Sequence, residues 1–556
     1  MVVIMNFYEE IHQHLDCPKQ EWATFKRDLA LKHKLPHIPT NIDIMLNIPE
    51  EDIPKFKKNL LTKPTRTISG VSPVAIMTRP EKCPHGKCTY CPGGINSPWG
   101  DVPQSYTGHE PATMRGKRND YDAYLQVFNR LQQYVLLGHN FEKVELIIMG
   151  GTFTATPKEY QEKFVRDAFQ AMNDFSDIFC TNIFNYKYFK EFFQLPGDMR
   201  SPERAKHLKE KLKKQKTTTS LEEEQLRNEK SIIKCVALCI ETKPDWALLE
   251  HGNEMLRQGC TRVELGVQTV YDDVLENTHR GHTCQDSIKS IQILRDLGFK
   301  INFHYMPGLP LTDRKRDIDG MKQIFTDPDY KPDMIKFYPC MVAPGTALHY
   351  QWKSGEFTPI DTDEAASRIS TIAPFIPEYC RIQRVQRDVP TKYWDAGVDK
   401  TNLRQYMEQE YKFESRDIRA REPKGKTINW DKVEIKVTEY SASGGTEFFI
   451  AAEDTSQDVL IGFARLRFPK EKLREEITPT SALLRELHVY GTATAIGESG
   501  TVQHKGWGTK LMKKAEEIAT KHNKKKMVVI SGVGVKNYYK NKLNYIKEGP
   551  YMVKEL

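Results

Sequence analysis

Three cysteines stand within nine residues, in the stretch Cys83-Pro-His-Gly-Lys-Cys88-Thr-Tyr-Cys91. Their spacing is C-x4-C-x2-C, and the apolar segment Val74–Met77 lies just before them. This order predicts a short strand followed by a Cys-, Gly- and Pro-rich loop. Such a loop can wrap a compact inorganic centre.

Three kinds of centre are compatible with this spacing. A zinc site needs a fourth ligand, for which His85 lies inside the loop. A plant-type ferredoxin site needs a later fourth cysteine, and the next cysteine, Cys180, is far along the chain. A [4Fe–4S] cluster held by three thiolates leaves one iron open, which can bind S-adenosylmethionine and cleave it to a 5′-deoxyadenosyl radical. The rest of the chain has to decide among them.

Length and composition set broad limits. The chain has 556 residues, enough for two or three domains, with 39% hydrophobic and 28% charged residues. We expect no membrane span and no signal peptide, because no apolar run is long enough. Eleven cysteines without regular pairing favour a reducing compartment, and therefore a cytoplasmic protein. A net charge of +8 permits nucleic-acid binding without demonstrating it.

Residues 73–390 alternate apolar runs with amphipathic stretches, which predicts parallel strands with right-handed helical crossovers. The expected fold class is α/β, with a partial (βα) barrel whose active site lies at the carboxyl ends of the strands. The predicted strands are Val74–Met77, Val144–Met149, Ile232–Ile240, Arg262–Val267, Ile301–Met306, Met334–Tyr338 and Cys380–Val385.

Polar or glycine-rich residues follow strand after strand in this region. They are Gly150 and Gly151, Glu241 to Asp245, Gly266 to Gln268, His304 to Gly308, and Lys336 to Cys340. With the thiol loop after the first strand, this recurrence predicts one site at the carboxyl edge of the barrel. Exposed backbone amides at the glycines can meet the amino-acid part of a ligand.

Flanking segments have their own composition. Residues 1–72 form a basic N-terminal segment, with Lys55, Lys57 and Lys58, that we interpret as a phosphate-contacting arm or a solvated face. Residues 196–230 interrupt the barrel pattern and predict a solvent-exposed helical insertion. Residues 391–430 are polar and arginine-rich, which predicts a linker that also contacts a polyanion.

Residues 431–556 predict a separate domain with a mixed α/β sheet. Its expected strands are Val433–Tyr440, Glu447–Ala452, Val459–Arg467, Leu484–Tyr490 and Met527–Ile530. Gln503-His-Lys-Gly506-Trp507-Gly508 opens a predicted helix, Thr509–Thr520, whose free N–H groups can bind a pyrophosphate. Four strands before this motif, and a strand and the Tyr538-Tyr539 pair after it, match the acetyl-CoA fold of the GNAT acetyltransferases.

Several segments together resemble the catalytic subunit of Elongator, the family of tRNA uridine-34 acetyltransferases that is also described as histone acetyltransferases. They are Cys83–Gly94, Gln104–Pro111, Gly150–Phe153, Ile240–Asp245, Arg280–His282, Val385–Pro390, Arg485–Gly491 and Gly549–Lys554. The likeness runs from about Lys63 to the C-terminus. The short cysteine loop is similar to the archaeal or bacterial form.

The resemblance implies a radical-SAM barrel fused to a GNAT domain. Cys83, Cys88 and Cys91 would hold a [4Fe–4S] cluster, and Gly150, Gly151, Glu241 and Gln268 would line the S-adenosylmethionine site. The adenosyl radical would remove a hydrogen atom from the acetyl group of acetyl-CoA, and the carbon radical would add to C5 of the wobble uridine to give carboxymethyluridine after hydrolysis.

The resemblance also assigns the acetyl-CoA site and the partners. Acetyl-CoA would contact Lys143, Glu486, Leu487, His488, Val489, Gln503, Gly506, Trp507, Gly508 and Tyr538. The candidate catalytic residues are Glu486, His488, Tyr538, Tyr539 and Lys336, with Lys336 and Tyr338 in the passage between the two sites. We expect tRNA at Lys63, Arg66, Arg115, Lys117 and Arg118, and assembly as a homodimer or with other Elongator-type subunits.

The chain departs from the family at three places. Lys243 stands where arginine is common, and Ser415 and Ala420 replace cysteines that could bind zinc. The turn at Asn544 lacks the usual glycine.

Other interpretations stay open. Glu486 and His488 could be a structural pair, the two tyrosines could be core residues, and Lys143 could be solvated. A conventional lysine acetyltransferase with Glu486 as general base, and a non-catalytic tRNA scaffold, are the competing functions.

Overall fold

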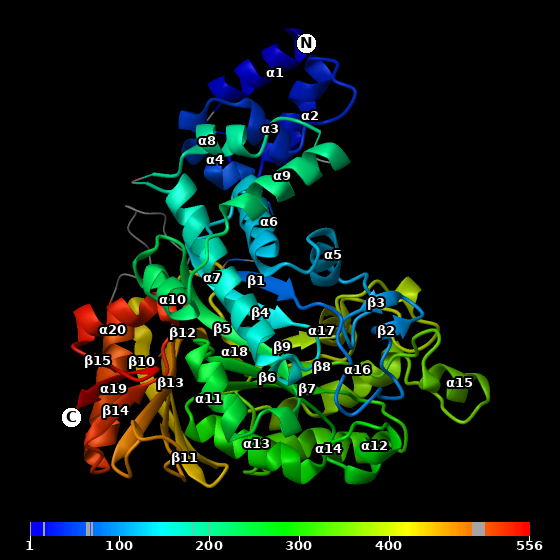
Figure 1. Ribbon diagram of the computed structural model, residues 1–556, viewed down its shortest axis with the longest axis vertical. Helices are drawn as coiled ribbons and strands as arrows, with labels where there is room; N and C mark the ends of the chain where they lie inside the picture. Colours follow the sequence, from blue (N-terminus) through cyan, green and yellow to red (C-terminus); the bar gives the residue numbers. More distant parts are fainter. Residues whose placement is uncertain are drawn as a thin grey trace.

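Two seven-stranded sheets dominate the protein (Figure 1). The computed structural model describes residues 2–14, 17–62, 67, 70–181, 183–198, 201–491 and 506–556. None of the described helices combines the length and the apolar character that a bilayer-spanning helix requires.

The first sheet is parallel throughout and follows the order of the chain. Its strands are β1 Ser72–Met77, β4 Lys143–Met149, β5 Lys234–Thr242, β6 Arg262–Gln268, β7 Lys300–Tyr305, β8 Met334–Phe337 and β9 Arg381–Val385. Strands β1 and β9 form the two edges, so the sheet is an open, partial barrel. All seven predicted strands are confirmed, with ends that differ by a few residues.

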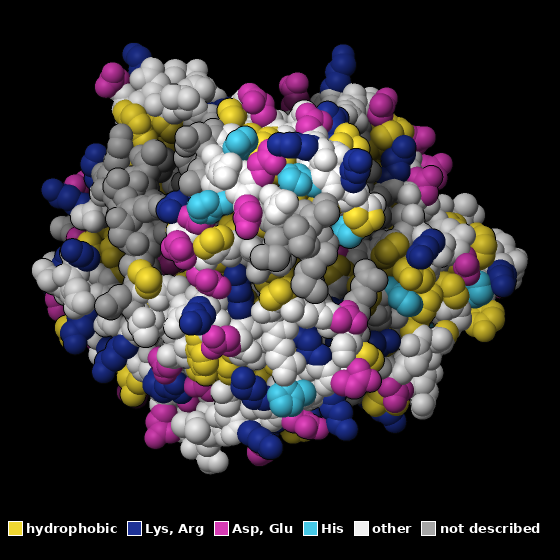
Figure 2. All heavy atoms as spheres, turned by 90° about the horizontal axis from the view of Figure 1, so that it is seen from above, with side chains coloured by type: hydrophobic (Ala, Val, Ile, Leu, Met, Phe, Trp, Pro, Cys, Tyr) yellow, Lys and Arg dark blue, Asp and Glu magenta, His cyan; other side chains and the backbone are white. Residues whose placement is uncertain are grey.

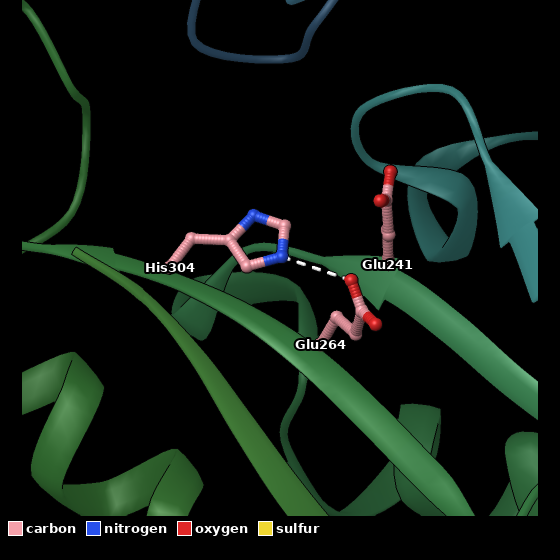
Figure 3. Close-up of side chains that lie close together, drawn as sticks. All are labelled: Glu241, Glu264 and His304. Atoms are coloured by element: carbon pink, nitrogen blue, oxygen red, sulfur yellow. Dashed lines mark hydrogen bonds and ion pairs between the residues drawn. The ribbon is translucent and has the colours of Figure 1, made fainter. Parts of the chain in front are cut away.

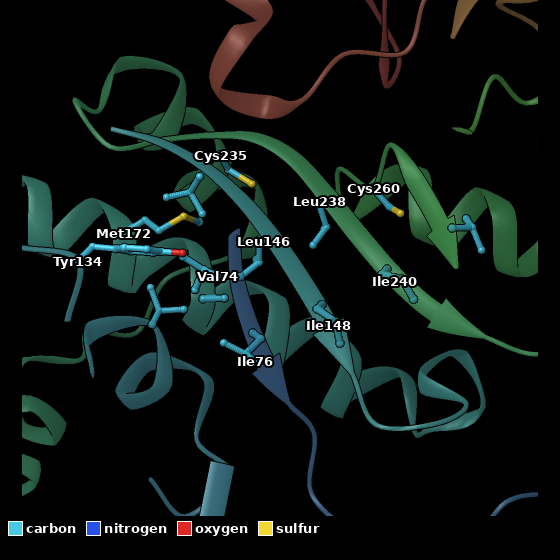
Figure 4. Packing of buried hydrophobic residues seen from close by; sticks show 14 of the residues in the cluster. Val74, Ile76, Tyr134, Leu146, Ile148, Met172, Cys235, Leu238, Ile240 and Cys260 are labelled. Carbon is cyan, nitrogen blue, oxygen red and sulfur yellow. The ribbon is translucent and has the colours of Figure 1, made fainter. Parts of the chain in front are cut away.

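Successive side chains of each strand point to opposite faces of the sheet. Val74, Ile76, Leu146, Ile148 and Ile240 point outward into an apolar layer (Figure 4), where they pack with helix side chains such as Tyr134 and Met172. The alternate positions point into the barrel and carry most of the polar side chains described below. The covering helices include α6 Ala123–Leu136, α7 Lys158–Phe179, α11 Leu249–Arg257, α12 Asp272–Asn277, α13 Cys284–Asp296, α14 Arg314–Thr326 and α16 Thr362–Thr371, whereas α15 Ala347–Lys353 projects away from the sheet (Figure 1).

Residues before the barrel form a helical unit and not an extended arm. The helices are α1 Val2–Gln13, α2 Trp22–Lys32, α3 Asn41–Asn47 and α4 Ile53–Leu60, and they bury Phe7, Trp22 and Phe56. Lys55 pairs with Asp52 at 2.6 Å. In the view from above, Lys and Arg side chains are interspersed with Asp and Glu (Figure 2). Lys63 and Arg66 lie outside the described residues.

The insertion is only partly exposed, so the prediction of a solvent-exposed segment was wrong for its second half. It contains α9 Pro202–Gln215 and α10 Leu221–Lys230, and α8 Tyr186–Phe192 precedes it. Leu221, Glu224 and Asn228 of α10 are fully buried against α7, where Asn173 donates to Glu224 at 2.7 Å.

The second sheet is mixed, as predicted. Its order is β10-β11-β12-β13-β14-β16-β15, and only β13 and β14 pair in parallel. The elements are β10 Val433–Ala442, β11 Gly445–Asp454, β12 Val459–Phe468, β13 Ser481–Val489, α19 Trp507–Lys521, β14 Lys526–Val529, α20 Lys536–Leu543, β15 Ile546–Glu548 and β16 Tyr551–Glu555. Helix α19 begins two residues earlier than predicted.

The segment 391–430 is folded and is not a free linker. It contains α17 Leu403–Glu410 and α18 Ile418–Arg421. Its arginines bind protein groups: Arg416 pairs with Asp458 at 2.8 Å, Arg419 donates to a carbonyl of β9, and Arg421 pairs with Glu453. Arg419 and Arg421 are therefore committed within the fold, whereas the Arg416 side chain is 56% exposed, so contact of this segment with a polyanion stays a prediction.

A buried ion-pair network joins the two sheets. Asp333, just before β8, accepts from Arg485 of β13 at 2.7 Å, and Asp296 of α13 accepts from Arg467 of β12 at 2.6 Å. The side chains of these four residues are 0% exposed. Although burial opposes it, Arg485 and Arg465 hold the pKa of Asp333 well below its usual range. The second sheet is thereby fixed at the amino ends of the barrel strands.

Asp333→Asn should lower the free energy of unfolding by about 3–5 kcal/mol, because it leaves buried arginines without their counter-charge. Chemical denaturation followed by tryptophan fluorescence measures the change. Lys315→Ala is the control, since it removes an ion pair whose lysine side chain is 87% exposed and should cost less than about 1 kcal/mol. Equal midpoints for the two variants would contradict the role given to the network.

Candidate active site

The three cysteines of the loop after β1 face one another. Cys88 Sγ lies 3.3 Å from His85 Nε2, and the backbone N–H of Ser105 donates to Cys91 Sγ at 3.3 Å. Burial is the main cause that raises the pKa of Cys83, and it raises that of Cys91 to about 11. Without a metal the thiols of Cys83 and Cys91 therefore stay protonated, and a metal or cluster would have to displace their protons.

Groups around the loop fit an iron–sulfur cluster and its ligand. Buried Arg280 donates to Gly266 O at 3.0 Å and lies 3.8 Å from Cys88 Sγ, while its Nε has no partner among the described atoms. Gly150 and Gly151 have φ of +143° and +94°, and a Cβ on Gly150 would lie 1.8 Å from Thr78 Oγ1. Only glycine fits the backbone at these two positions. The next residue, Thr152, has its hydroxyl 3.9 Å from Cys83 Sγ, so this turn lies beside the thiol loop.

A cavity of about 560 Å³ extends from the thiol loop into the barrel. Seven of its lining residues are Lys or Arg and four are Asp or Glu, so its wall suits an anionic ligand. Its polar and glycine lining residues include Cys83, Tyr106, Gly151, Glu241, Glu264, Gln268, Arg280, His304, Lys336, Tyr338 and Arg387. The predicted residues Gly151, Glu241, Gln268, Lys336 and Tyr338 are thus brought together.

Glu264 is the electrostatic centre of the cavity (Figure 3). Its carboxylate binds Lys336 Nζ, accepts from His304 Nε2 at 2.9 Å, and pairs with Arg262 at 3.3 Å. Burial opposes ionisation, but Lys336 and His304 lower the pKa of Glu264 well below its usual range. The ligand atoms of Glu241, Glu264 and His304 lie within 4.8 Å of one another, yet a divalent cation there would have to displace Lys336.

Glu241 is the titratable neighbour of this centre. It is paired across the strands with Glu264 and accepts from the Tyr106 hydroxyl at 2.7 Å. Burial first, and then the charge of Glu264, raise the pKa of Glu241 to about 7. Its carboxyl therefore changes charge near neutral pH and can act as a proton acceptor or as a hydrogen-bonding group.

A second candidate site lies where β13 and β14 separate. Their pairing ends at Leu484 with Val529, whereas β13 continues beside β12 to Val489. Among the residues that the structure describes, none pairs as a strand with the second edge of 486–489. The N-cap of α19 is Gly506, with φ of +73°, and a Cβ on Gly508 would lie 3.0 Å from the Tyr538 hydroxyl. Gly506, Gly508, Val489 and Tyr538 thus border one opening, while Gln503 lies outside the described residues.

Glu486 and His488 face the barrel from β13. Glu486 pairs with Lys300 at the start of β7 and accepts from Arg465 at 2.8 Å. Against the effect of burial, Lys300 and Arg465 lower the pKa of Glu486 to about 2. Burial lowers the pKa of His488 to about 4, and its Nε2 has no partner among the described atoms. Glu486 is an ionised structural partner, whereas neutral His488 is free to meet a ligand.

The remaining predicted residues lie in different environments. Tyr538 is 36% exposed, but Tyr539 is 6% exposed and packs in the core of the second sheet. Asn544 replaces the usual glycine with φ of +60°, a conformation that asparagine tolerates. Lys143 is exposed at the first position of β4.

Arg115 is not a surface residue. It is 6% exposed, donates to the Ala75 carbonyl at 2.6 Å and lines the cavity, so its predicted contact with tRNA could be made only from inside the cavity and stays a prediction. Lys117 and Arg118 of α5 Pro111–Arg118 are exposed, as expected of phosphate contacts.

Sequence reasoning missed Tyr106, Glu264, Arg280 and Arg387 as lining residues. Tyr106 and Arg280 lie in two segments that carry the family resemblance, Gln104–Pro111 and Arg280–His282. Glu264 lies two residues before the glycine near the end of β6. The alternation of inward positions along that strand would have selected Glu264.

Polar side chains connect the two sites through the barrel. Lys300, Asn302 and His304 are successive inward residues of β7; Lys300 contacts Glu486, and His304 lines the cavity. Four residues of strand span roughly 13 Å. Asn302 also binds Gln383, another lining residue. The thioester-binding candidate and the thiol loop are therefore at opposite ends of one polar interior.

Comparisons with known proteins agree with this architecture. Residues 77–319 match the Radical SAM superfamily, 332–412 the Radical_SAM C-terminal domain, 8–68 the ELP3 N-terminal domain and 405–545 the Acetyltransferase (GNAT) family. The chain is 43% identical to the "tRNA uridine(34) acetyltransferase" of Methanocaldococcus jannaschii, over 93% of this chain and 90% of that one. The chain belongs to the Elongator complex protein 3 family.

Other members of the family give the same result. "Elongator complex protein 3" of Homo sapiens is 37% identical, with 96% of this chain and 92% of that one covered. The solved structure described as "The archaeal Methanocaldococcus infernus Elp3 with N-terminus deletion (1-46)" is similar with a TM-score of 0.71 and 38% identity, over 88% of this chain and 100% of that one. Family membership makes the chain an acyltransferase whose domains use a [4Fe–4S] cluster, S-adenosylmethionine and acetyl-CoA.

Cys88→Ser should abolish most iron binding after anaerobic reconstitution, because two thiolates do not hold the cluster. Iron, sulfide and zinc analysis with the absorption spectrum measures this. Cys17→Ser, which changes a cysteine of the N-terminal helical unit, is the matched control and should load normally. A Cys88→Ser protein that still binds the full amount of iron would contradict the ligand assignment.

Glu241→Gln should flatten the pH dependence of apo-protein stability. An ordinary glutamic acid titrates near 4.5, so the folded state holds an extra proton between about pH 4.5 and 7 and loses its advantage as pH rises. Relative to the variant, the wild type should lose on the order of 2 kcal/mol from pH 5 to pH 8. Denaturant titrations at both pH values test this, and parallel profiles would contradict it.

Proposed function

We propose that this chain modifies the wobble uridine of tRNA, using acetyl-CoA to place a carboxymethyl group on C5. The observation that carries the proposal is the polar barrel interior, which has the thiol loop at one end and the β13–β14 opening at the other. The relatives named tRNA uridine(34) acetyltransferase support the choice of substrate.

Cys83, Cys88 and Cys91 would hold the cluster, and Gly150, Gly151, Glu241 and Gln268 would hold S-adenosylmethionine. When bound, these groups supply a carbon radical that can remove a hydrogen atom from the acetyl methyl group. The acetyl-derived radical would form a bond to C5 of the uridine, and the adduct would lose the C5 proton and one electron, which the bound cluster could accept. Hydrolysis of the thioester would then release CoA and leave the carboxymethyl group on the base.

Lys336 and His304 would act on the substrate inside the cavity. Burial opposes the charge on Lys336, but Glu264 raises its pKa, so it stays cationic. A cation at this point stabilises negative charge on a carbonyl oxygen of the uracil or of the thioester. Burial lowers the pKa of His304 to about 4, so its ring is neutral; the N–H of Nε2 donates to Glu264 and leaves Nδ1 as an acceptor toward the cavity.

Acetyl-CoA would enter at the β13–β14 opening. The α19 amino terminus at Gly506–Gly508 would bind the pyrophosphate, and Tyr538 and the edge of residues 486–489 would bind the thioester arm. His488 would face the acetyl group, with the inward residues of β7 marking the way to the cavity.

The tRNA would approach the carboxyl edge of the barrel, where Lys117 and Arg118 are exposed and the cavity wall is basic. All eleven cysteines are free, which fits the reducing cytoplasm. Elongator-type subunits or a second copy of the chain are the expected partners.

A conventional lysine acetyltransferase is the weaker alternative. That reaction needs a base with a pKa near neutral, and Glu486 is held at about 2 by two cations.

Anaerobic incubation with tRNA, acetyl-CoA, S-adenosylmethionine and a reductant, followed by mass spectrometry of nucleosides, tests the proposal. The wild type should form carboxymethyluridine, and Lys336→Met should lower the rate at least about tenfold without changing tRNA affinity. Lys353→Met, an exposed lysine of α15, is the control. Full modification by Cys88→Ser, or lysine acetylation without reductant in place of tRNA modification, would refute the proposal.

A further inference from the structure

Three aromatic rings from distant segments meet beside the cavity. Trp99 lies in the turn between β2 Gly94–Ser97 and β3 Gly100–Val102, His109 precedes α5, and Tyr393 follows β9. His109 stacks on Tyr393 with ring centroids 3.9 Å apart and planes at 10°. Trp99 meets both edge-on, at 5.4 and 5.9 Å. We call these three residues the ring cluster.

Residues that adjoin the ring cluster in the chain line the cavity. Glu110 and Pro111, next to His109, and Val389, shortly before Tyr393, line the cavity. Arg387 lines it too, with its guanidinium 5.5 Å from the Tyr338 ring and 5.9 Å from that of Trp394. In Figure 1 the β2–β3 hairpin and α5 are on the same side of the barrel, away from the second sheet.

A purely structural role does not explain the ring cluster. Its residues belong to none of the three hydrophobic core clusters among the described residues, and all three rings are only partly buried. Partly exposed aromatic rings in a fixed stack present a flat surface to which a further planar group can add.

The surrounding charge selects the kind of planar group. Lys392 lies 5.1 Å from the Tyr393 ring, and Lys117 lies against Gly108 beside His109. The neighbouring carboxylates are already occupied: Glu110 accepts from the N–H groups of Thr107 and Gly108, and Asp388 pairs with Arg384. Cations beside rings suit a ligand that carries both phosphates and bases.

We propose that the ring cluster is a stacking platform for unpaired RNA bases next to the uridine that enters the cavity. This deepens the proposed function and rests on it. Sequence-selective proteins bind single-stranded loops by stacking splayed bases on Tyr, Trp and His, while Lys and Arg contact the backbone. The platform would hold a neighbouring base outside while the target base turns inward.

The test uses an anticodon stem–loop RNA with 2-aminopurine in place of the base after the wobble uridine. Tyr393→Ala should weaken binding about 5- to 100-fold, the range for loss of one stacked base. It should also reduce the 2-aminopurine quenching seen with the wild type. Tyr393→Phe should bind normally. Tyr350→Ala is the control, because that ring on α15 is 65% exposed and outside the ring cluster.

Salt dependence separates stacking from charge. Tyr393→Ala should leave the slope of log Kd against log salt unchanged, whereas the double variant Lys117→Ala, Arg118→Ala should reduce it. If the wild type binds and modifies RNA but Tyr393→Ala matches it in affinity and fluorescence, the platform is wrong and the proposed function stands. If the wild type neither binds nor modifies the RNA, both fail.

Discussion

Buried charge pairing between the two sheets is the constraint on which the site depends. Asp333 binds arginines from two strands of the second sheet, and Glu486 is held between Arg465 and Lys300 of the barrel. A buried charge without its partner would destabilise the fold. The two domains can therefore separate only if all of these charges become exposed to water. The same pairing turns the open edge of β13 toward the amino ends of the barrel strands. The orientation of the two domains and the geometry of the site therefore depend on the same ion pairs.

The barrel interior has an unusual composition for a core. Outward positions of β1, β4 and β5 carry Val, Ile and Leu, whereas inward positions of β6 to β8 carry Arg262, Glu264, His304 and Lys336. Glu264 pairs with Arg262 and Lys336 and accepts from His304, so each of these buried polar side chains has a partner within the wall. Glu241 stands at the end of this series with a pKa near neutral, so the passage contains one group whose charge changes under working conditions.

Much of the fold and part of the candidate site could be predicted from the sequence. The parallel strands of the first sheet and the mixed second sheet were predicted correctly, because hydrophobic period and length distinguish strands from helices. The thiol loop and the glycine-rich strand ends could be identified because each consists of residues that are close together in the chain. The resemblance supplied the functional assignments.

Long-range pairing could not be predicted. Nothing near Glu486 in sequence indicates Lys300, and the arginines of 391–430 appeared free because their partners lie on distant strands. The burial of Arg115 could not be predicted for the same reason. The sequence of its helix does not indicate which of the three basic residues points inward to β1. α10 was expected in solvent because its charges hide the buried Leu221, Glu224 and Asn228.

Transfer of a hydrogen atom between the two ends of the barrel tests the central claim most directly. Acetyl-CoA with a fully deuterated acetyl group is supplied with tRNA, S-adenosylmethionine and reductant, and 5′-deoxyadenosine is analysed by mass spectrometry. The account predicts deuterium in 5′-deoxyadenosine and in the carboxymethyl group of the modified uridine. Modified uridine that forms while 5′-deoxyadenosine contains no deuterium would contradict it.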